Sequence, residues 1–426
     1  MSIELLALII CFVVMMVIGT PIAYNLLIST ITYVLISNFD VVVVGMKMFE
    51  GMNSFSFLAV PFFVITGQLM LRGGLLELLV DFVNAFFGRC KGAIAMVTIG
   101  ASLLMGSIVG LAVASAASLG VFLIPMMKKE GYDPAFAAAT MSSASLLGPI
   151  MPPSILMIMY SISVGNTSIA GLFLAAVIPA ITIAILQMFV ANKVSKKRGY
   201  PSYAKVSGRE KWRVTKAALP VLMLPVIILG GIFSGIFSIT EASAIAALYS
   251  AIIAFFVRKT VSWKDIPTII MEATSTTGLV LLLAGAGSAM AWTIANERVL
   301  DMLIGPLSTM PSWAFLILVN VILLICGCFM DDYASIVILA PIIAPIAWQL
   351  GIAPLHIAAI ICINLVVGLA TPPFGITLFV TSPIAGVKIE DTVREAVPYI
   401  LITIAVLLLV TFIPAITTIL PRLAGY

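Results

Sequence analysis

Charged residues are scarce in this sequence. Asp, Glu, Lys and Arg make up 9% of its 426 residues, and only one histidine is present. A soluble domain carries about 25% charged residues, whereas this chain is 62% hydrophobic. Such a chain cannot cover itself with polar surface in water, which excludes a soluble enzyme, a nucleic-acid-binding protein and a disordered protein. The composition predicts a polytopic membrane protein of the all-α class, with the lipid bilayer as its surroundings.

Metal-binding and catalytic motifs are also missing. Among the five cysteines, Cys326 and Cys328 form one close pair without a second pair or a nearby histidine. A zinc site needs about four such ligands. No H-E-x-x-H, G-x-S-x-G or P-loop sequence occurs, and these motifs mark common hydrolases and nucleotide-binding proteins. We therefore expect no transition metal, no organic cofactor and no enzymatic activity.

Hydrophobic runs long enough to cross a membrane follow one another along the chain. A helix needs about 20 apolar residues to cross ~30 Å of hydrocarbon. Runs of this kind lie at 3–19, 20–37, 54–71, 168–191, 217–235, 238–257, 274–291 and 396–420. Four further stretches are interrupted by Gly, Pro and polar residues: 92–127, 134–165, 312–350 and 354–385. Such breaks cannot face lipid, so they must face protein or a watery cavity.

Basic residues indicate the orientation of these runs. The segment 192–216 carries nine Lys or Arg against one acid, Glu210, and the positive-inside rule places it in the cytoplasm. We interpret 92–127 and 312–350 as re-entrant hairpins that enter and leave on one side. With every other run crossing once, 19 of the 22 basic residues become cytoplasmic. Both termini are then expected on the periplasmic side.

The second half of the sequence repeats the glycine and proline pattern of the first half at an offset of about 220 residues. The aligned positions include Gly67 with Gly287, Gly148 with Gly368, and Pro152-Pro153 with Pro372-Pro373. The matches fall at glycines and prolines, which interrupt helices, rather than at abundant Leu or Ile. This argues that the similarity of the two halves is not due to chance. Each half holds five crossings and one hairpin, and an odd number of crossings inverts the second copy.

The predicted organisation is therefore two inverted-topology repeats, 1–191 and 217–426, joined by the basic linker 192–216. Each repeat has a re-entrant hairpin and a discontinuous helix. Inverted repeats build many secondary transporters, whose sites lie near the bilayer midplane at broken helices. We expect the two hairpin tips to meet there, beside the two proline breaks.

The broken helices carry chemistry suited to ions. Carbonyl groups freed at a helix break suit a cation such as Na⁺, and a half-helix N-terminus suits a carboxylate. Hydroxyl groups cluster at both breaks and at both tips. They belong to Ser142, Ser143, Ser145 and Ser154 in the first half, to Thr371 and Thr377 in the second, and to Ser115 and Ser335 at the tips. Each hydroxyl alone could equally bond its own helix.

Asp331 and Asp332 are the only acids predicted deep in the membrane, where carboxylates are costly and often functional. They could balance a Na⁺ charge or relay a proton, or one could simply cap the next helix. An intramembrane aspartyl protease would need two facing carboxylates from separate helices, which this chain does not offer. Two closed hairpins favour alternating access over an open channel.

Several motifs make the sequence similar to a known family. GYDP at 131–134, IMPPSILMIMY at 150–160, GIFSITEASA at 235–244 and GLATPPFGITLF at 368–379 resemble the large membrane subunit of tripartite ATP-independent periplasmic (TRAP) transporters, the DctM-like family. The resemblance covers nearly the whole chain. It implies Na⁺-driven import of an organic acid across the bacterial inner membrane. It also implies two partners, a small four-helix DctQ-like membrane subunit and a periplasmic substrate-binding protein.

The resemblance further implies an elevator mechanism. The transport domain would comprise 92–165 and 312–385, and the scaffold 1–37, 168–260 and 396–426, with 54–71 and 274–291 connecting them. The sequence departs from the family pattern at Leu111-Ala112 in the first tip and at Asp331-Asp332-Tyr333 in the second.

The site residues follow from these alignments. The resemblance implies Na⁺ binding where each tip meets the adjacent broken helix. The expected Na⁺-binding residues are Gly110, Ser115, Ser145, Gly148, Pro149, Gly327, Asp331, Ser335, Gly368 and Thr371. The expected substrate-binding residues are Pro153, Ser154, Asp332, Pro373 and Thr377. A self-sufficient Na⁺/carboxylate symporter of the same superfamily, without a binding protein, is the alternative.

Overall fold

The computed structural model describes residues 2–88, 90–165, 167–202, 207–308 and 310–426, and within these ranges the chain forms helices and no strand. Nine helices in these ranges are long and apolar enough to cross a membrane, or up to ten if one bent pair counts as a single span. The prediction of an all-α polytopic membrane protein is thereby confirmed. Arg89 and Lys205, two of the basic residues expected in the cytoplasm, lie outside the described residues.

The helices follow the predicted runs closely. The first half contains α1 (Ile3–Ile18), α2 (Ile22–Ile36), α3 (Val42–Met52), α4 (Ala59–Arg72), α5 (Leu75–Phe87), α6 (Ala93–Val109), α7 (Ala112–Lys129), α8 (Pro134–Ser145), α9 (Leu147–Ile150), α10 (Ile155–Val164) and α11 (Ile169–Arg198). The second half contains α12 (Gly208–Phe233), α13 (Ile239–Ile252), α14 (Ile266–Asn296), α15 (Val299–Ser308), α16 (Ser312–Phe329), α17 (Asp332–Gln349), α18 (Pro354–Gly368), α19 (Ile376–Ala385), α20 (Ile389–Phe412) and α21 (Ala415–Leu423).

One predicted run is wrong in its extent. The run 396–420 was expected as a single crossing, but α20 ends at Phe412 and the separate helix α21 starts at Ala415. The break lies at Ile413, whose backbone leaves the helical region with φ −119° and ψ 83°. Pro414 follows it, and a proline disfavours the helical conformation of the residue before it.

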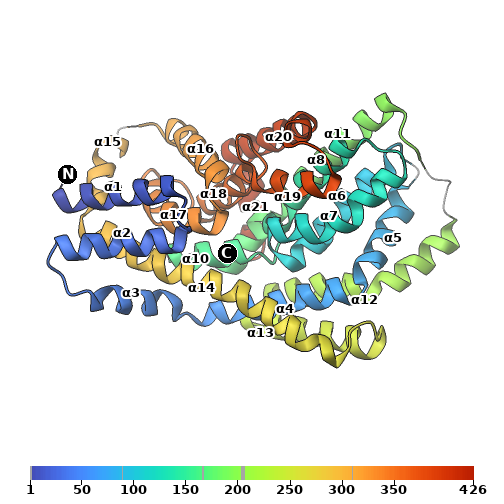
Figure 1. Cartoon of the computed structure of the whole chain (residues 1–426), viewed down its shortest axis with the longest axis horizontal. Coiled ribbons are helices and arrows are strands. Elements are labelled where there is room, and N and C mark those ends of the chain that lie inside the picture. The colour runs from blue at the N-terminus through green and yellow to red at the C-terminus, as the bar shows by residue number, and fades with distance from the viewer. Residues whose placement is uncertain (1, 89, 166, 203–206, 309) are drawn as a thin grey trace.

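The helix α3 was not predicted, and it extends the chain leading into α4. Both α3 and α4 pack along the unbroken 31-residue helix α14, and the short 3-10 turn between them at Phe55–Leu58 packs on α13 and α10. Glycines allow this close packing: a side chain at Gly51 would overlap Ser288, and one at Gly285 would lie 3.1 Å from the Met48 carbonyl oxygen. Small residues let membrane helices approach each other in this way. Figure 1 shows α3, α4 and α14 along one edge of the molecule.

The interrupted stretches form the middle of the molecule (Figure 1). Helices α6 and α7 make one hairpin and α16 and α17 the other, while α8–α10 and α18–α19 are the broken helices. Each hairpin packs on the broken helix of its own half. In addition, α7 packs against α19 and α17 against α10, so each hairpin also touches the far end of the other broken helix.

Polar contacts tie the broken helix α8 to α11 and α20. The Gln187 side chain of α11 donates to the Ser143 carbonyl oxygen at 3.1 Å, and the hydroxyls of Thr140 and Tyr399 lie 3.0 Å apart. Near the end of α11, the Arg198 guanidinium pairs with the Glu395 carboxylate at 2.7 Å. The first two contacts are buried, so α8 is joined to α11 and α20 by bonds that are costly to break. The Arg198–Glu395 pair lies at the surface.

Candidate functional site at the helix breaks

The first hairpin tip is built around Gly106, Gly110 and Gly148. Gly110 ends α6 with φ +68°, a left-handed conformation that glycine adopts without steric cost. A side chain at Gly106 would lie 2.5 Å from the Cα of Gly148. The hairpin backbone therefore rests directly on the backbone of the broken helix, where α8 gives way to α9. Beside this contact, the Ser115 hydroxyl lies 3.2 Å from the position of a Cβ on Gly148.

The second hairpin tip repeats this construction. A side chain at Gly368 would lie 2.5 Å from the carbonyl carbon of Gly327, so α16 and α18 meet through bare backbone. The Cys328 thiol also lies 3.7 Å from the carbonyl oxygen of Pro372. Both Pro-Pro bonds at the breaks, Pro152-Pro153 and Pro372-Pro373, are cis.

Two buried hydroxyls at the tips lack partners. The side chains of Ser115 and Ser335 are fully buried, and neither hydroxyl has a hydrogen-bond partner within the described residues. Their positions differ by 220 residues, the offset of the sequence repeat. A buried hydroxyl without a partner costs about 1–3 kcal/mol, so each oxygen is a candidate ligand for something that binds there.

The two tips are in contact with each other. The Tyr333 hydroxyl at the start of α17 donates to the Gly110 carbonyl oxygen at 3.3 Å. The two broken helices are also bonded, because the hydroxyls of Ser142 and Thr377 lie 2.8 Å apart. The two hairpin tips therefore meet, as expected. The tips and the adjacent helix breaks belong to one buried region.

Other predicted site hydroxyls are bonded to the main chain. Ser145 donates to the Ser142 carbonyl oxygen at 2.7 Å, and Ser154 donates to the Pro149 carbonyl oxygen at 2.6 Å. In the second half, Thr371 donates to the Val367 carbonyl oxygen at 2.8 Å and Thr377 to the Leu369 carbonyl oxygen at 3.0 Å. These hydroxyl oxygens keep acceptor lone pairs. Pro149 and Pro153 are buried beside them, whereas Pro373 is exposed.

The two aspartates differ in their surroundings. Asp331 caps α17, and its carboxylate accepts from the Tyr333 N–H at 3.3 Å. Asp332 is only 3% exposed, and its carboxylate accepts from the same N–H at 3.1 Å. In the part of the chain that the structure describes, neither carboxylate forms a salt bridge with Lys or Arg. A buried carboxylate without a counter-charge favours either a bound cation or protonation.

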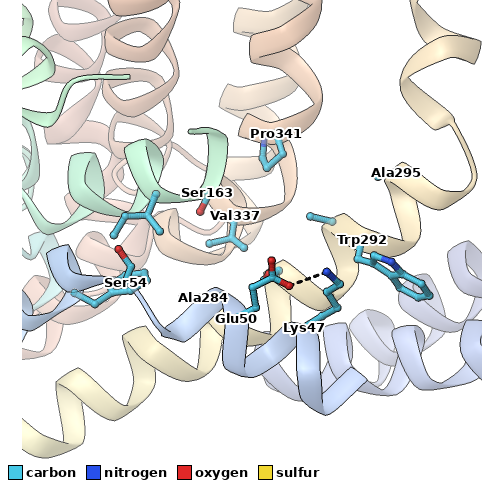
Figure 2. A pocket seen from close by; sticks show the side chains of 15 residues that line it. Lys47, Glu50, Ser54, Ser163, Ala284, Trp292, Ala295, Val337 and Pro341 are labelled. Atoms are coloured by element: carbon cyan, nitrogen blue, oxygen red, sulfur yellow. Dashed lines mark hydrogen bonds and ion pairs between the residues drawn. The ribbon is translucent and has the colours of Figure 1, made fainter. Parts of the chain in front are cut away.

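A pocket of about 410 Å³ lies between α3, α14, α17 and the end of α10. Figure 2 shows the Lys47–Glu50 ion pair, 2.7 Å long, on the α3 side of this pocket, with Ser163 and Val337 across from it. None of the predicted site residues lines the pocket. Val337 lies two residues beyond Ser335 on α17, so the pocket approaches the second tip along that helix.

Gly287 lets α14 and α17 approach each other closely beside this pocket. A side chain at Gly287 on α14 would overlap the Cγ1 of Val337 on α17. The sequence did carry a signal for this position, since Gly287 aligns with Gly67 in the repeat. The pocket itself was missed because its walls come from four separate helices.

Comparison with known proteins relates this chain to one family along most of its length. The family described as "Tripartite ATP-independent periplasmic transporter, DctM component" matches residues 9–416. The C4-dicarboxylate TRAP transporter large permease protein DctM of Pseudomonas aeruginosa is 37% identical over 93% of both chains. The sialic acid TRAP transporter large permease protein SiaM of Vibrio cholerae is 34% identical over 96% of both chains.

A solved structure also shares the fold. The YdaH transporter of Alcanivorax borkumensis superimposes with a TM-score of 0.61 over 86% of each chain, at 16% sequence identity. At that identity the likeness concerns the helical architecture alone.

Proposed function

Because the chain belongs to the DctM component family of TRAP transporters, a family of permease subunits and not of enzymes, we propose that it imports an organic acid by Na⁺-coupled transport. Large permeases of this family work with a small membrane subunit and a periplasmic binding protein. We propose the same two partners here, a DctQ-like four-helix subunit and a protein that delivers the substrate.

The observation that carries Na⁺ coupling is the pair of orphan hydroxyls, Ser115 and Ser335. Each lies at a hairpin tip whose backbone rests on a broken helix, so carbonyl groups and a hydroxyl converge there. Na⁺ prefers such neutral oxygens at interrupted helices. Asp332, buried without a salt bridge among the described residues, supplies a negative charge beside Ser335. We assign one Na⁺ to each tip.

The substrate carboxylate is assigned to the space between the two Na⁺ sites. The N-terminus of α10, capped by Ser154, faces this space, and the buried Thr377 lies at the start of α19. Half-helix N-termini attract anions. The exposed Pro373 is left out of this site. Asp332 is assigned to Na⁺ rather than to substrate, because its carboxylate would repel another carboxylate. The relatives' substrates, C4-dicarboxylates and sialic acid, are the first acids to examine.

Inverted repeats and an elevator movement complete the proposal. The reciprocal packing of α7 on α19 and of α17 on α10 is what an inverted pair of repeats predicts. The bonds from α8 to α11 and α20, with the ion pair between α11 and α20, lead us to include these two helices in the mobile unit, in place of the scaffold. The arm formed by α3, α4 and α14 then belongs to the scaffold side. The basic segment 192–216 is placed in the cytoplasm by its charge.

Reconstitution in proteoliposomes tests the function directly. The permease and its small subunit would be supplied with the binding protein, a labelled organic acid and an inward Na⁺ gradient. We expect uptake to require both the gradient and the binding protein. Uptake that persists without the binding protein would favour the self-sufficient symporter, and uptake that persists when K⁺ replaces Na⁺ would contradict Na⁺ coupling.

Removing the orphan hydroxyls should weaken Na⁺ activation. Ser115→Ala and Ser335→Ala each delete one proposed ligand, and both residues are buried in helices where alanine fits well. A lost ligand oxygen worth about 1.4 kcal/mol raises the Na⁺ concentration for half-maximal uptake about tenfold. Ser118→Ala is the matched control, because the Ser118 hydroxyl already donates to the Ala114 carbonyl oxygen. Unchanged Na⁺ curves in both tip variants would refute the assignment.

A further inference from the structure

A groove between α5, α6 and α11 lies away from the helix breaks. Its outer part, about 830 Å³, is lined by Lys91, Asn192 and Lys196 together with Phe87, Ile185 and Met188. Its inner part, about 380 Å³, shares the last three residues and is otherwise lined by aliphatic and aromatic side chains and Gly100. Because the two parts share these residues, they adjoin as one groove with a polar mouth and an apolar inner end.

The charge at the mouth is positive and uncompensated. Lys91 and Lys196 are exposed, and among the described residues neither ammonium group has a carboxylate partner. The Asn192 amide donates to the Lys91 carbonyl oxygen at 2.9 Å and so holds the two sides of the mouth together. A third cation lies near the apolar wall, because the Lys211 ammonium stands 5.0 Å from the centre of the Phe86 ring.

The length of the groove matches one leaflet of a bilayer. Lys196 and Ile181, which line its two ends on α11, are 15 residues apart, or about 22 Å along a helix at ~1.5 Å per residue. Half of a bilayer, with headgroups, is about 20–22 Å thick. The mouth lies at the basic end of α11, where Lys193, Lys196, Lys197 and Arg198 mark the water interface.

The lining of the inner part favours a lipid chain as its occupant. An acyl chain there would meet only apolar side chains and Gly100, while the cations at the mouth would face the phosphate. Basic pockets between membrane helices are known to suit anionic lipid headgroups.

We propose that this groove is a binding site for one anionic phospholipid, with its phosphodiester between Lys91 and Lys196 and an acyl chain along α6 and α11. The site is independent of the ion and substrate sites. The lipid fills the seam where α5 meets the hairpin helix α6, and it would thereby stabilise the packing of these elements.

Native mass spectrometry with lipid titration tests the proposal. We expect the wild-type permease to retain one phosphatidylglycerol in preference to phosphatidylcholine. Lys196→Gln should weaken phosphatidylglycerol binding about fivefold, the contribution of one basic residue near a membrane. Lys197→Gln, one position along α11 and outside the groove lining, should leave binding unchanged. Ile185→Trp, at an exposed position, should obstruct the groove and reduce retention of the lipid while the protein stays folded.

Several outcomes would overturn the site. Equal retention of the two lipids, or equal weakening by Lys196→Gln and Lys197→Gln, would leave only a general attraction to the basic end of α11. Competition by soluble glycerol 3-phosphate at the affinity of the intact lipid would indicate a free phosphate site. Loss of the bound lipid when the small membrane subunit is added would show that a protein helix covers the groove instead.

Discussion

Replacing Gly368 by alanine is expected to remove most of the Na⁺-dependent uptake. The new methyl group would lie 2.5 Å from the carbonyl carbon and 2.6 Å from the Cα of Gly327. Both atoms belong to the backbone of the hairpin helix α16, so no side-chain rotation can make room. Overpacking of this kind costs about 1–3 kcal/mol, and moving the tip displaces the proposed Na⁺ ligands. Uptake should fall about tenfold or more, since ~1.4 kcal/mol corresponds to a factor of ten.

The control for this variant is Gly230→Ala. Gly230 is also helical, but a side chain there meets no atom within 4 Å. Alanine should be accepted or even favoured at that position, because glycine is a poor helix former. Membrane-inserted protein is quantified in parallel, so that a lower uptake rate is separated from a lower amount of transporter. A Gly368→Ala variant with full uptake would show that the two backbones can separate without functional cost.

The sequence predicted the backbone breaks better than the side-chain bonds. Gly148, Gly368 and the two Pro-Pro pairs were recognised because glycine and proline restrict the backbone wherever they occur. The bonding of hydroxyls was not predictable to the same degree. Ser115 and Ser335 lack partners while Thr371 donates to Val367, and this difference depends on local geometry that residue identity does not specify.

Contacts between segments far apart in the sequence could not be predicted either. The Glu297 carboxylate accepts from the Tyr33 hydroxyl at 2.9 Å and from the Ser2 hydroxyl, more than 260 residues away, and nothing in the sequence near Glu297 indicates these partners. The helix α3 escaped prediction because Asp40, Lys47 and Glu50 lower the hydropathy of its segment. It nevertheless packs along α14, and that pairing depends on glycines more than 200 residues apart.

The second large effect is expected at Gly287, on the wall between the arm and the second hairpin. A methyl group there would overlap the Cγ1 of Val337. Gly287→Ala must therefore push α14 and α17 apart or force Val337 out of its rotamer. At about 1–3 kcal/mol for overpacking, uptake should fall by a factor of about 5 to 150. Gly278→Ala on the same helix meets no atom within 4 Å and should transport normally.

A second substitution at Val337 separates a steric cause from a general loss of stability. Val337→Ala removes the overlapping Cγ1 and leaves only its Cβ, 2.9 Å from the new methyl group, so the double variant Gly287→Ala/Val337→Ala should regain much of the lost uptake. The interaction energy in this double-mutant cycle should be favourable, because the two residues are in direct contact. If the double variant is as inactive as Gly287→Ala, or if the two effects simply add, the clash with Val337 is not the cause of the lost uptake. Rescue would instead indicate that Gly287 and Val337 lie at the interface where the proposed mobile hairpin slides against the arm.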